Sequence, residues 1–188
     1  MSENDVQQPD RYMKLLSLDN AEQAYREVKK LASDLTDDEH LIRSCIFDLH
    51  AAVETELRRV YYHHFKSLLA FTDDEISNKK CLKTLSDTVG RLGFMEMYRV
   101  LGPVLKSWPY PDLDSIPAIN ETRNRAAHTG KINEVEYKGR NPFKDPDCFA
   151  QMYFDVWAIT QSMTKFFNRT IEEPLWRLRK YREKYGDL

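Results

Sequence analysis

Hydrophobic residues recur at intervals of three and four along most of the 188-residue chain, which is the period of amphipathic helices. The pattern predicts a first helix over 19–35, with Asp19 or Asn20 as its N-cap. A second helix is predicted from Thr36 to about residue 70, because Thr36 and Glu39 have capping-box spacing and no glycine or proline interrupts the segment. The apolar stripe of that helix comprises Ile42, Ile46, Leu49, Val53, Leu57 and Val60.

The rest of the chain continues the helical period with more interruptions. Further helices are predicted over 78–89, 94–107, 116–128, 147–170 and 172–185. Gly102-Pro103 is expected to kink or end the helix over 94–107, and Gly130 stands just past the expected end of the helix over 116–128. The polar connection over 130–146 has room for a small hairpin at Val135–Lys138.

Composition agrees with an all-α helical bundle in a single domain. Six glycines and eight prolines are few, which argues against loop-rich β architectures. Three widely spaced cysteines suit a reducing compartment better than a disulfide framework. No apolar run approaches the roughly 18 residues of a membrane span, and the acidic, polar start is unlike a signal peptide. We therefore expect a cytoplasmic protein that does not enter a membrane.

The near-neutral net charge of −2 conceals a gradient along the chain. Residues 1–60 contain 8 Lys or Arg and 13 Asp or Glu, whereas residues 121–188 contain 13 Lys or Arg and 10 Asp or Glu. The net charge excludes a uniformly basic nucleic-acid coat. An anion, if the protein binds one, is expected in the last third of the chain.

The sequence lacks the common motifs of nucleotide-binding loops, serine hydrolases, zinc proteases and paired-cysteine metal sites. Adjacent His63 and His64 project from different sides of a helix. Cys45, His50 and Glu54 offer too few convergent ligands for a tight metal site. We expect neither a bound metal nor another cofactor.

The most informative segment is 119–128, near the end of the helix predicted over 116–128. On an ideal helix, Arg123 falls inside the apolar stripe, where a charge is costly unless it has a partner. Asn124 and His128 are neighbours four residues apart on another side of the helix. Ala126 and Ala127 are small and allow another helix to approach closely.

A purely structural interpretation of Arg123 is available. Glu56 falls at the edge of the apolar stripe of the second predicted helix, so an ion pair between Glu56 and Arg123 would satisfy two buried charges. In that case His128 would only be a residue that the helix dipole favours at a C-terminal end.

Residues 123–128, Arg-Asn-Arg-Ala-Ala-His, resemble the R-x4-H motif of the HEPN superfamily, which often begins Arg-Asn. The long early helix, with Glu54 and Glu56 embedded in it, also resembles that family. So does the order of motif helix, polar loop and closing helices. The resemblance implies a HEPN-like bundle with a four-helix core over 36–170, an extension and first helix over 1–35, and a basic helix over 171–188 packed on the bundle.

The resemblance further implies a metal-independent endoribonuclease that works as a homodimer, with both motifs in one cleft. RNA supplies its own nucleophile, the 2′-hydroxyl. Arg123 would bind the phosphate and stabilise transition-state charge, and His128 would act as general acid or base, since histidine exchanges protons near neutrality. Asn124 would orient the phosphate or His128, with Glu54 and Glu56 in supporting places. Family members serve as toxins in defence modules, so an antitoxin protein is a candidate partner.

Basic residues lie in and after the motif helix. The candidate RNA-binding residues are Arg125, Lys131, Lys138 and Arg140. The last predicted helix adds a basic cluster, Arg177, Arg179, Lys180, Arg182 and Lys184, with Trp176 as a stacking surface. The alternative for this cluster is a solvated basic helix face.

Two other functions remain open beside the nuclease. One is a non-catalytic HEPN module that binds RNA, a nucleotide or a protein partner. The other is a helical regulatory or interaction protein in which Arg123 has only a structural role.

Overall fold

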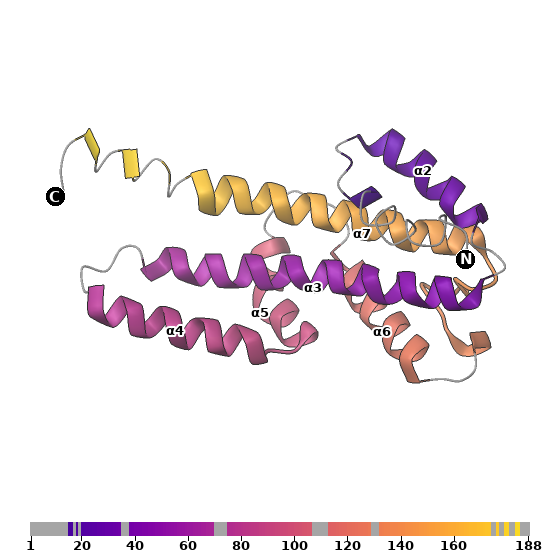
Figure 1. The fold of residues 1–188 in the computed structure, drawn as a ribbon, viewed down its shortest axis with the longest axis horizontal. Helices are drawn as coiled ribbons and strands as arrows, with labels where there is room; N and C mark the ends of the chain where they lie inside the picture. The colour runs from indigo at the N-terminus through magenta and orange to yellow at the C-terminus, as the bar shows by residue number, and fades with distance from the viewer. Residues whose placement is uncertain are drawn as a thin grey trace, which may run out of the picture. The chain divides into compact units, whose positions relative to one another are not determined.

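The computed structural model describes residues 15–16, 18, 20–34, 38–69, 75–106, 113–128, 132–173, 176, 179–180 and 183–184. The fold over this part of the chain is an all-α helical bundle, as the sequence predicts (Figure 1). Its residues fall into two compact units. Unit 1 draws on Met1–Val53 and Pro111–Gln161, and unit 2 on Glu54–Tyr110 and Ser162–Leu188.

The α-helices agree closely with the segments expected from the sequence. They are α2 Ala21–Asp34, α3 Glu39–Leu69, α4 Glu75–Arg91, α5 Phe94–Lys106, α6 Ser115–His128 and α7 Pro146–Phe167. A 3₁₀ turn, Ile132–Glu134, precedes α7, and a π-helical turn, Asn168–Glu172, continues it. Among the described helices, none combines the length and apolar character needed to cross a membrane.

Acidic and amide side chains begin three of these helices. Asn20 accepts hydrogen bonds from the backbone N–H groups of Glu22 and Gln23 at the start of α2, which confirms one of the two predicted caps. Asp38 accepts from Leu41 N–H at the start of α3. Thr36, the expected cap of α3, lies outside the described residues. Asp145 caps α7 in the same way, with Pro146 in the first helical position.

Within unit 1, α6 runs antiparallel to the first half of α3. Residue 43 lies opposite 126, residue 47 opposite 123 and residue 50 opposite 120. Helix α2 runs antiparallel to α7, with the Tyr25 and Phe154 rings edge to face at 5.6 Å and Lys29 paired with Asp147 (Figure 1). The buried side chains of α3, α6 and α7 in this unit include Ile42, Ile46, Leu49, Val53, Ile116, Ile119, Phe149, Met152, Tyr153 and Val156.

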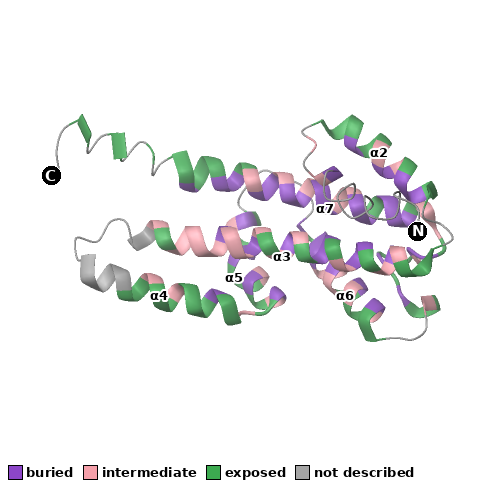
Figure 2. Ribbon diagram, in the orientation of Figure 1, coloured by how far each residue is buried: buried purple, intermediate pink, exposed green. Residues whose placement is uncertain are grey.

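Within unit 2, α4 and the end of α7 both contact the second half of α3. Arg58 donates hydrogen bonds to the carbonyls of Val89 and Leu92, at the C-terminal end of α4. Arg59 contacts Thr164, and the His63 ring lies edge to face with Phe167 at 5.0 Å, so α3 and α7 run in the same direction here. Exposed positions dominate residues 80–91, the part of α4 whose burial is described (Figure 2).

Some helix ends differ from the expected ones. Gly90 lies in the last turn of α4, and the break between α4 and α5 falls at Gly93. Pro103 is accommodated inside α5, which continues to Lys106 because Leu101 and Leu105 remain buried on one face. Of the segment predicted over 172–185, residues 172–173, 176, 179–180 and 183–184 are described; Glu172 ends the π-helical turn and the others are α-helical.

Candidate functional site

Helix α6 is held on α3 by interactions spaced along its length. Arg43 donates a hydrogen bond to the carbonyl of Ala126, near the C-terminal end of α6. The helix dipole favours a cation at that end. His50 Nε2 lies 3.2 Å from Asn120 Oδ1, and the His50 side chain is buried. Between these two contacts the Arg123 guanidinium lies over the Phe47 ring, 5.6 Å from its centroid. These contacts fix the position and rotation of the R-x4-H helix within unit 1.

The two sides of α6 differ sharply in exposure. Ile116, Ile119, Thr122 and Ala126 are buried, whereas Asn124, Ala127 and His128 are exposed. The expectation that both alanines would face a neighbouring helix is therefore met by Ala126 and not by Ala127. Solvent reaches the side of α6 that bears Asn124 and His128.

Arg123 is half-buried and has neutral partners. Its Nη1 donates to Asn124 Oδ1 at 3.1 Å, in addition to the contact with Phe47. The ion pair between Glu56 and Arg123 considered from the sequence is wrong, since Glu56 pairs with Arg59 at 2.5 Å. The register explains the error: Arg123 lies opposite Phe47, and Glu56 is nine positions after Phe47 on α3, which is about 13.5 Å along the axis at 1.5 Å per residue.

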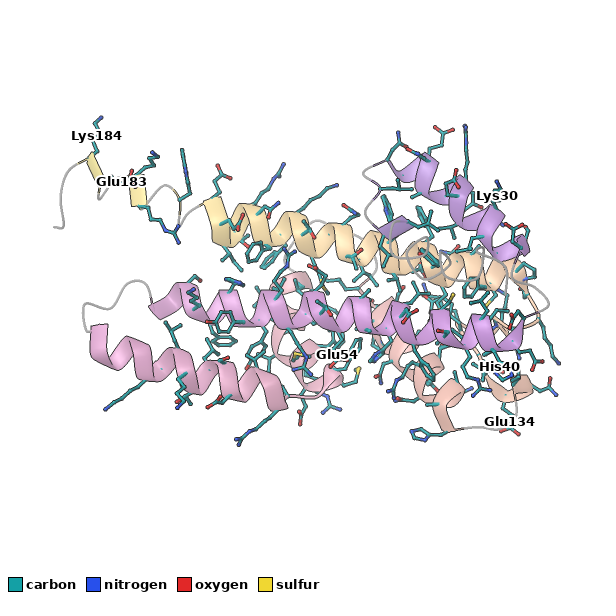
Figure 3. All side chains as sticks on the ribbon, in the orientation of Figure 1. Lys30, His40, Glu54, Glu134, Glu183 and Lys184 are labelled. Carbon is teal, nitrogen blue, oxygen red and sulfur yellow. The ribbon has the colours of Figure 1, made fainter. Side chains whose placement is uncertain are left out.

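The two acidic residues of α3 have structural partners in unit 2. Glu54, labelled on α3 in Figure 3, accepts from Arg58 Nη2 at 2.6 Å. Glu56 and the Thr164 hydroxyl both bind Arg59, whose guanidinium also lies 4.5 Å from the centroid of the Phe167 ring. The contacts of Glu54 and Glu56 therefore orient arginines that hold α4 and the end of α7 against α3.

The described basic residues predicted to bind RNA are each paired with a carboxylate. Arg125 contacts Glu121 at 2.6 Å and Glu136 at 3.2 Å. Lys138 lies 2.9 Å from Asp155, and Arg140 lies 3.2 Å from Asp145. Lys131 lies outside the described residues.

The connection after α6 is fastened to the two helices beside it. Tyr137 and Arg140 form a bridge around a two-residue turn, in which Lys138 (φ 49°) and Gly139 (φ 79°) have the positive φ angles of a hairpin turn. The Tyr137 hydroxyl donates to Asp155 of α7 at 2.5 Å. The Thr122 hydroxyl of α6 lies 2.7 Å from the carbonyl of Glu136. This bridge lies slightly later in the chain than the hairpin expected at Val135–Lys138.

The residues that position α6 were missed in the sequence. Arg43, Phe47 and His50 follow one another at spacings of four and three, so they share one side of α3 beside its apolar stripe. This spacing could have identified them, because it places polar and aromatic residues in a line along one face of α3. Such a line indicates that a neighbouring helix packs on that face. Asn120 lies one turn before Arg123 on α6 and completes the set.

The described part of the chain gathers no group of three or more His, Cys, Asp or Glu side chains that would suit a metal ion. Comparison with protein-family models, curated proteins and solved structures finds no match for this chain. The function must therefore be inferred from the motif and its surroundings.

Proposed function

We propose that the chain is a HEPN-type endoribonuclease that needs no metal ion and acts as a homodimer, with Arg123, Asn124 and His128 as its working residues. One observation carries the proposal. Arg123 is held by an amide and an aromatic ring, while Arg125, two residues away, is paired with Glu121 and Glu136. The positive charge of Arg123 is thus oriented without being neutralised by a salt bridge among the described residues, as an anion-binding group requires.

The proposed chemistry is a transesterification within the RNA strand. The 2′-oxygen attacks the adjacent phosphorus, the bond from phosphorus to the 5′-oxygen breaks, and a 2′,3′-cyclic phosphate and a 5′-hydroxyl result. His128 of one copy takes the proton of the 2′-hydroxyl, and the second copy's histidine returns a proton to the leaving 5′-oxygen. Arg123 stabilises the charge that develops on the phosphoryl oxygens.

A homodimer supplies what one motif lacks. A single motif contains one histidine, whereas the reaction takes up one proton and releases another. Asn124 and His128 are exposed on one side of α6, so a second copy can reach them. We therefore expect active preparations to have twice the 22.2 kDa mass of one chain in light scattering.

The direct test is cleavage of end-labelled RNA by the purified full chain in the presence of EDTA. We expect products ending in 2′,3′-cyclic phosphate, and we expect His128→Ala to lose at least about 100-fold in rate. His40→Ala is the matched control, because His40 is an exposed histidine near the start of α3 (Figure 3). Equal cleavage by wild type and His128→Ala, or loss of cleavage in EDTA, would contradict the mechanism.

A second candidate is a HEPN module that binds RNA, a nucleotide or a protein without cutting. The carboxylate partners of Arg125, Lys138 and Arg140 favour a nucleotide or a protein as the ligand of this module, because paired cations give a weaker field for a long RNA strand. Binding of intact RNA that is unchanged in His128→Ala would select this candidate over the nuclease.

A further inference from the structure

A cavity of about 280 Å³ lies in unit 2, between the C-terminal part of α3 and the segment that follows α7. Phe167 and Ile171, both buried, line its apolar part, and Trp176 lines it with a side chain that is 59% exposed. His63, Lys66 and Arg179 supply polar groups that are positive or can become so, and Glu172 supplies a carboxylate. These residues are distinct from the R-x4-H helix, which belongs to unit 1.

The cavity combines the two kinds of group that recognise a nucleotide. An exposed indole offers a flat surface on which any base can stack, and stacking on aromatic side chains is a major source of binding energy for unpaired bases. Lys66 and Arg179 offer ammonium and guanidinium donors for a phosphate. The His63 ring lies edge to face with the buried Phe167 ring, with 5.0 Å between their centroids.

We propose that this cavity binds one nucleotide unit, with its base against Trp176 and its phosphate on Lys66 and Arg179. The volume of about 280 Å³ lies just below the roughly 300–1,000 Å³ usual for ligand pockets, so it suits one unit and not a longer segment. Glu172 can accept a hydrogen bond from an exocyclic amino group, as carboxylates do at base edges. The cavity therefore prefers adenine, cytosine or guanine, which carry such a group, over uracil.

The nucleotide can come from a free mononucleotide or from an RNA strand. Adenosine 5′-monophosphate and a six-residue oligoadenylate, titrated separately by calorimetry, distinguish these sources. Tight binding of the monophosphate identifies a free ligand, and binding of the oligomer alone identifies a strand. Oligomer titrations use full-length His128→Ala, so that cleavage does not consume the probe. The proposal does not rest on the nuclease, because binding here is measured without cleavage.

Substitutions at the rim of the cavity test its assignment. We expect Trp176→Ala and Arg179→Ala each to weaken binding about tenfold, which corresponds to about 1.4 kcal/mol. Lys180→Ala is the matched control, because Lys180 lies beside Arg179, is 59% exposed at its side chain, pairs with Glu183 and does not line the cavity. We expect Glu172→Gln to reduce the preference for adenosine over uridine monophosphate.

A direct spectroscopic readout localises the ligand. Whichever probe binds should shift the NMR resonance of the Trp176 indole N–H. That resonance is assigned by its disappearance in Trp176→Phe. The proposal is overturned if neither probe binds, if Lys180→Ala weakens binding as much as Arg179→Ala, or if phenyl phosphate binds as tightly as adenosine monophosphate. The last outcome would show an anion site without recognition of a base.

Discussion

Replacing Arg123 by alanine distinguishes a functional role of this arginine from a structural one. In the structure, the substitution removes a cation–π contact with Phe47 and a hydrogen bond to the exposed Asn124. A partly exposed cation–π contact contributes about 0.5–1 kcal/mol, and a solvent-accessible hydrogen bond adds little. We therefore expect Arg123→Ala to lower the free energy of unfolding by about 1 kcal/mol. A buried ion pair broken from one side would cost about 3–5 kcal/mol.

Urea unfolding and RNA cleavage, measured on the same preparation, show whether the loss of activity in Arg123→Ala exceeds what its loss of stability explains. In thermal unfolding of the same variants, about 1 kcal/mol corresponds to a shift of about 2–4 °C in Tm for a chain of this size. Cleavage should fall by about 100-fold or more, as it does when one donor to a transition-state oxyanion is removed. Phe47→Leu removes the ring and keeps an apolar side chain, so a double-mutant cycle with Arg123→Ala should give a coupling energy of about 0.5–1 kcal/mol.

The control is Arg26→Ala, which removes an arginine from the exposed face of α2, where it pairs only with the exposed Glu22 among the described residues. It should change neither stability nor cleavage measurably. If Arg123→Ala loses 3 kcal/mol or more and cleavage falls only as far as unfolding explains, Arg123 is structural and the proposed role is refuted.

Other outcomes follow from unit 2 and from the buried thiols. Arg58→Ala should lower the free energy of unfolding by about 2 kcal/mol in urea titrations, since it removes the ion pair with Glu54 and the hydrogen bonds to the carbonyls of Val89 and Leu92; an unchanged midpoint would contradict this. Burial, and then the Asp48 carboxylate, raise the pKa of Cys45 to about 12, and burial raises the pKa of Cys148 to about 11, so a thiol reagent should label only the exposed Cys81 quickly in the native protein. Burial, followed by the charges of Lys66 and Arg59, lowers the pKa of His63 from its ordinary 6.5 despite the opposing charge of Glu172. The unfolded chain therefore binds more protons, and stability falls as the pH drops below 6.5; His63→Gln should show a flatter acid limb, whereas parallel curves would exclude the linkage.

Local signals in the sequence were enough to predict most helices. The segment predicted over 94–107 forms Phe94–Lys106, and the segment predicted over 116–128 forms Ser115–His128. Both predictions agree with the structure because the period of apolar residues and the residues that end a helix act within one or two turns of the chain. The helix predicted to end at residue 89 continues through Gly90 to Arg91, since a glycine in a last turn costs a helix only about 1 kcal/mol and other contacts compensate. The contacts of Arg58 at the end of α4 are such a compensation.

The partner of Arg123 could not be predicted in this way. A helical wheel gives the direction in which a side chain points, and it gives no position along the axis of a neighbouring helix. Arg123 and Glu56 both have suitable directions, yet the antiparallel register of α3 and α6 places Phe47 opposite Arg123. That register is set by nonlocal contacts, such as Arg43 with Ala126 and His50 with Asn120, which are far apart in the chain.

The charge gradient along the chain acquires a different meaning once the ion pairs are known. Counting residues placed the capacity to bind anions throughout the last third, but Arg125, Lys138 and Arg140 there are paired with carboxylates. An incoming phosphate must compete with those carboxylates, so each such pair contributes less to binding than its formal charge indicates. Arg123, held by Phe47 and Asn124, faces no competing carboxylate among its described contacts. The choice of partner for each cation, and not the net charge of the segment, therefore decides which cation can accept an incoming anion, and it ranks Arg123 above Arg125, Lys138 and Arg140.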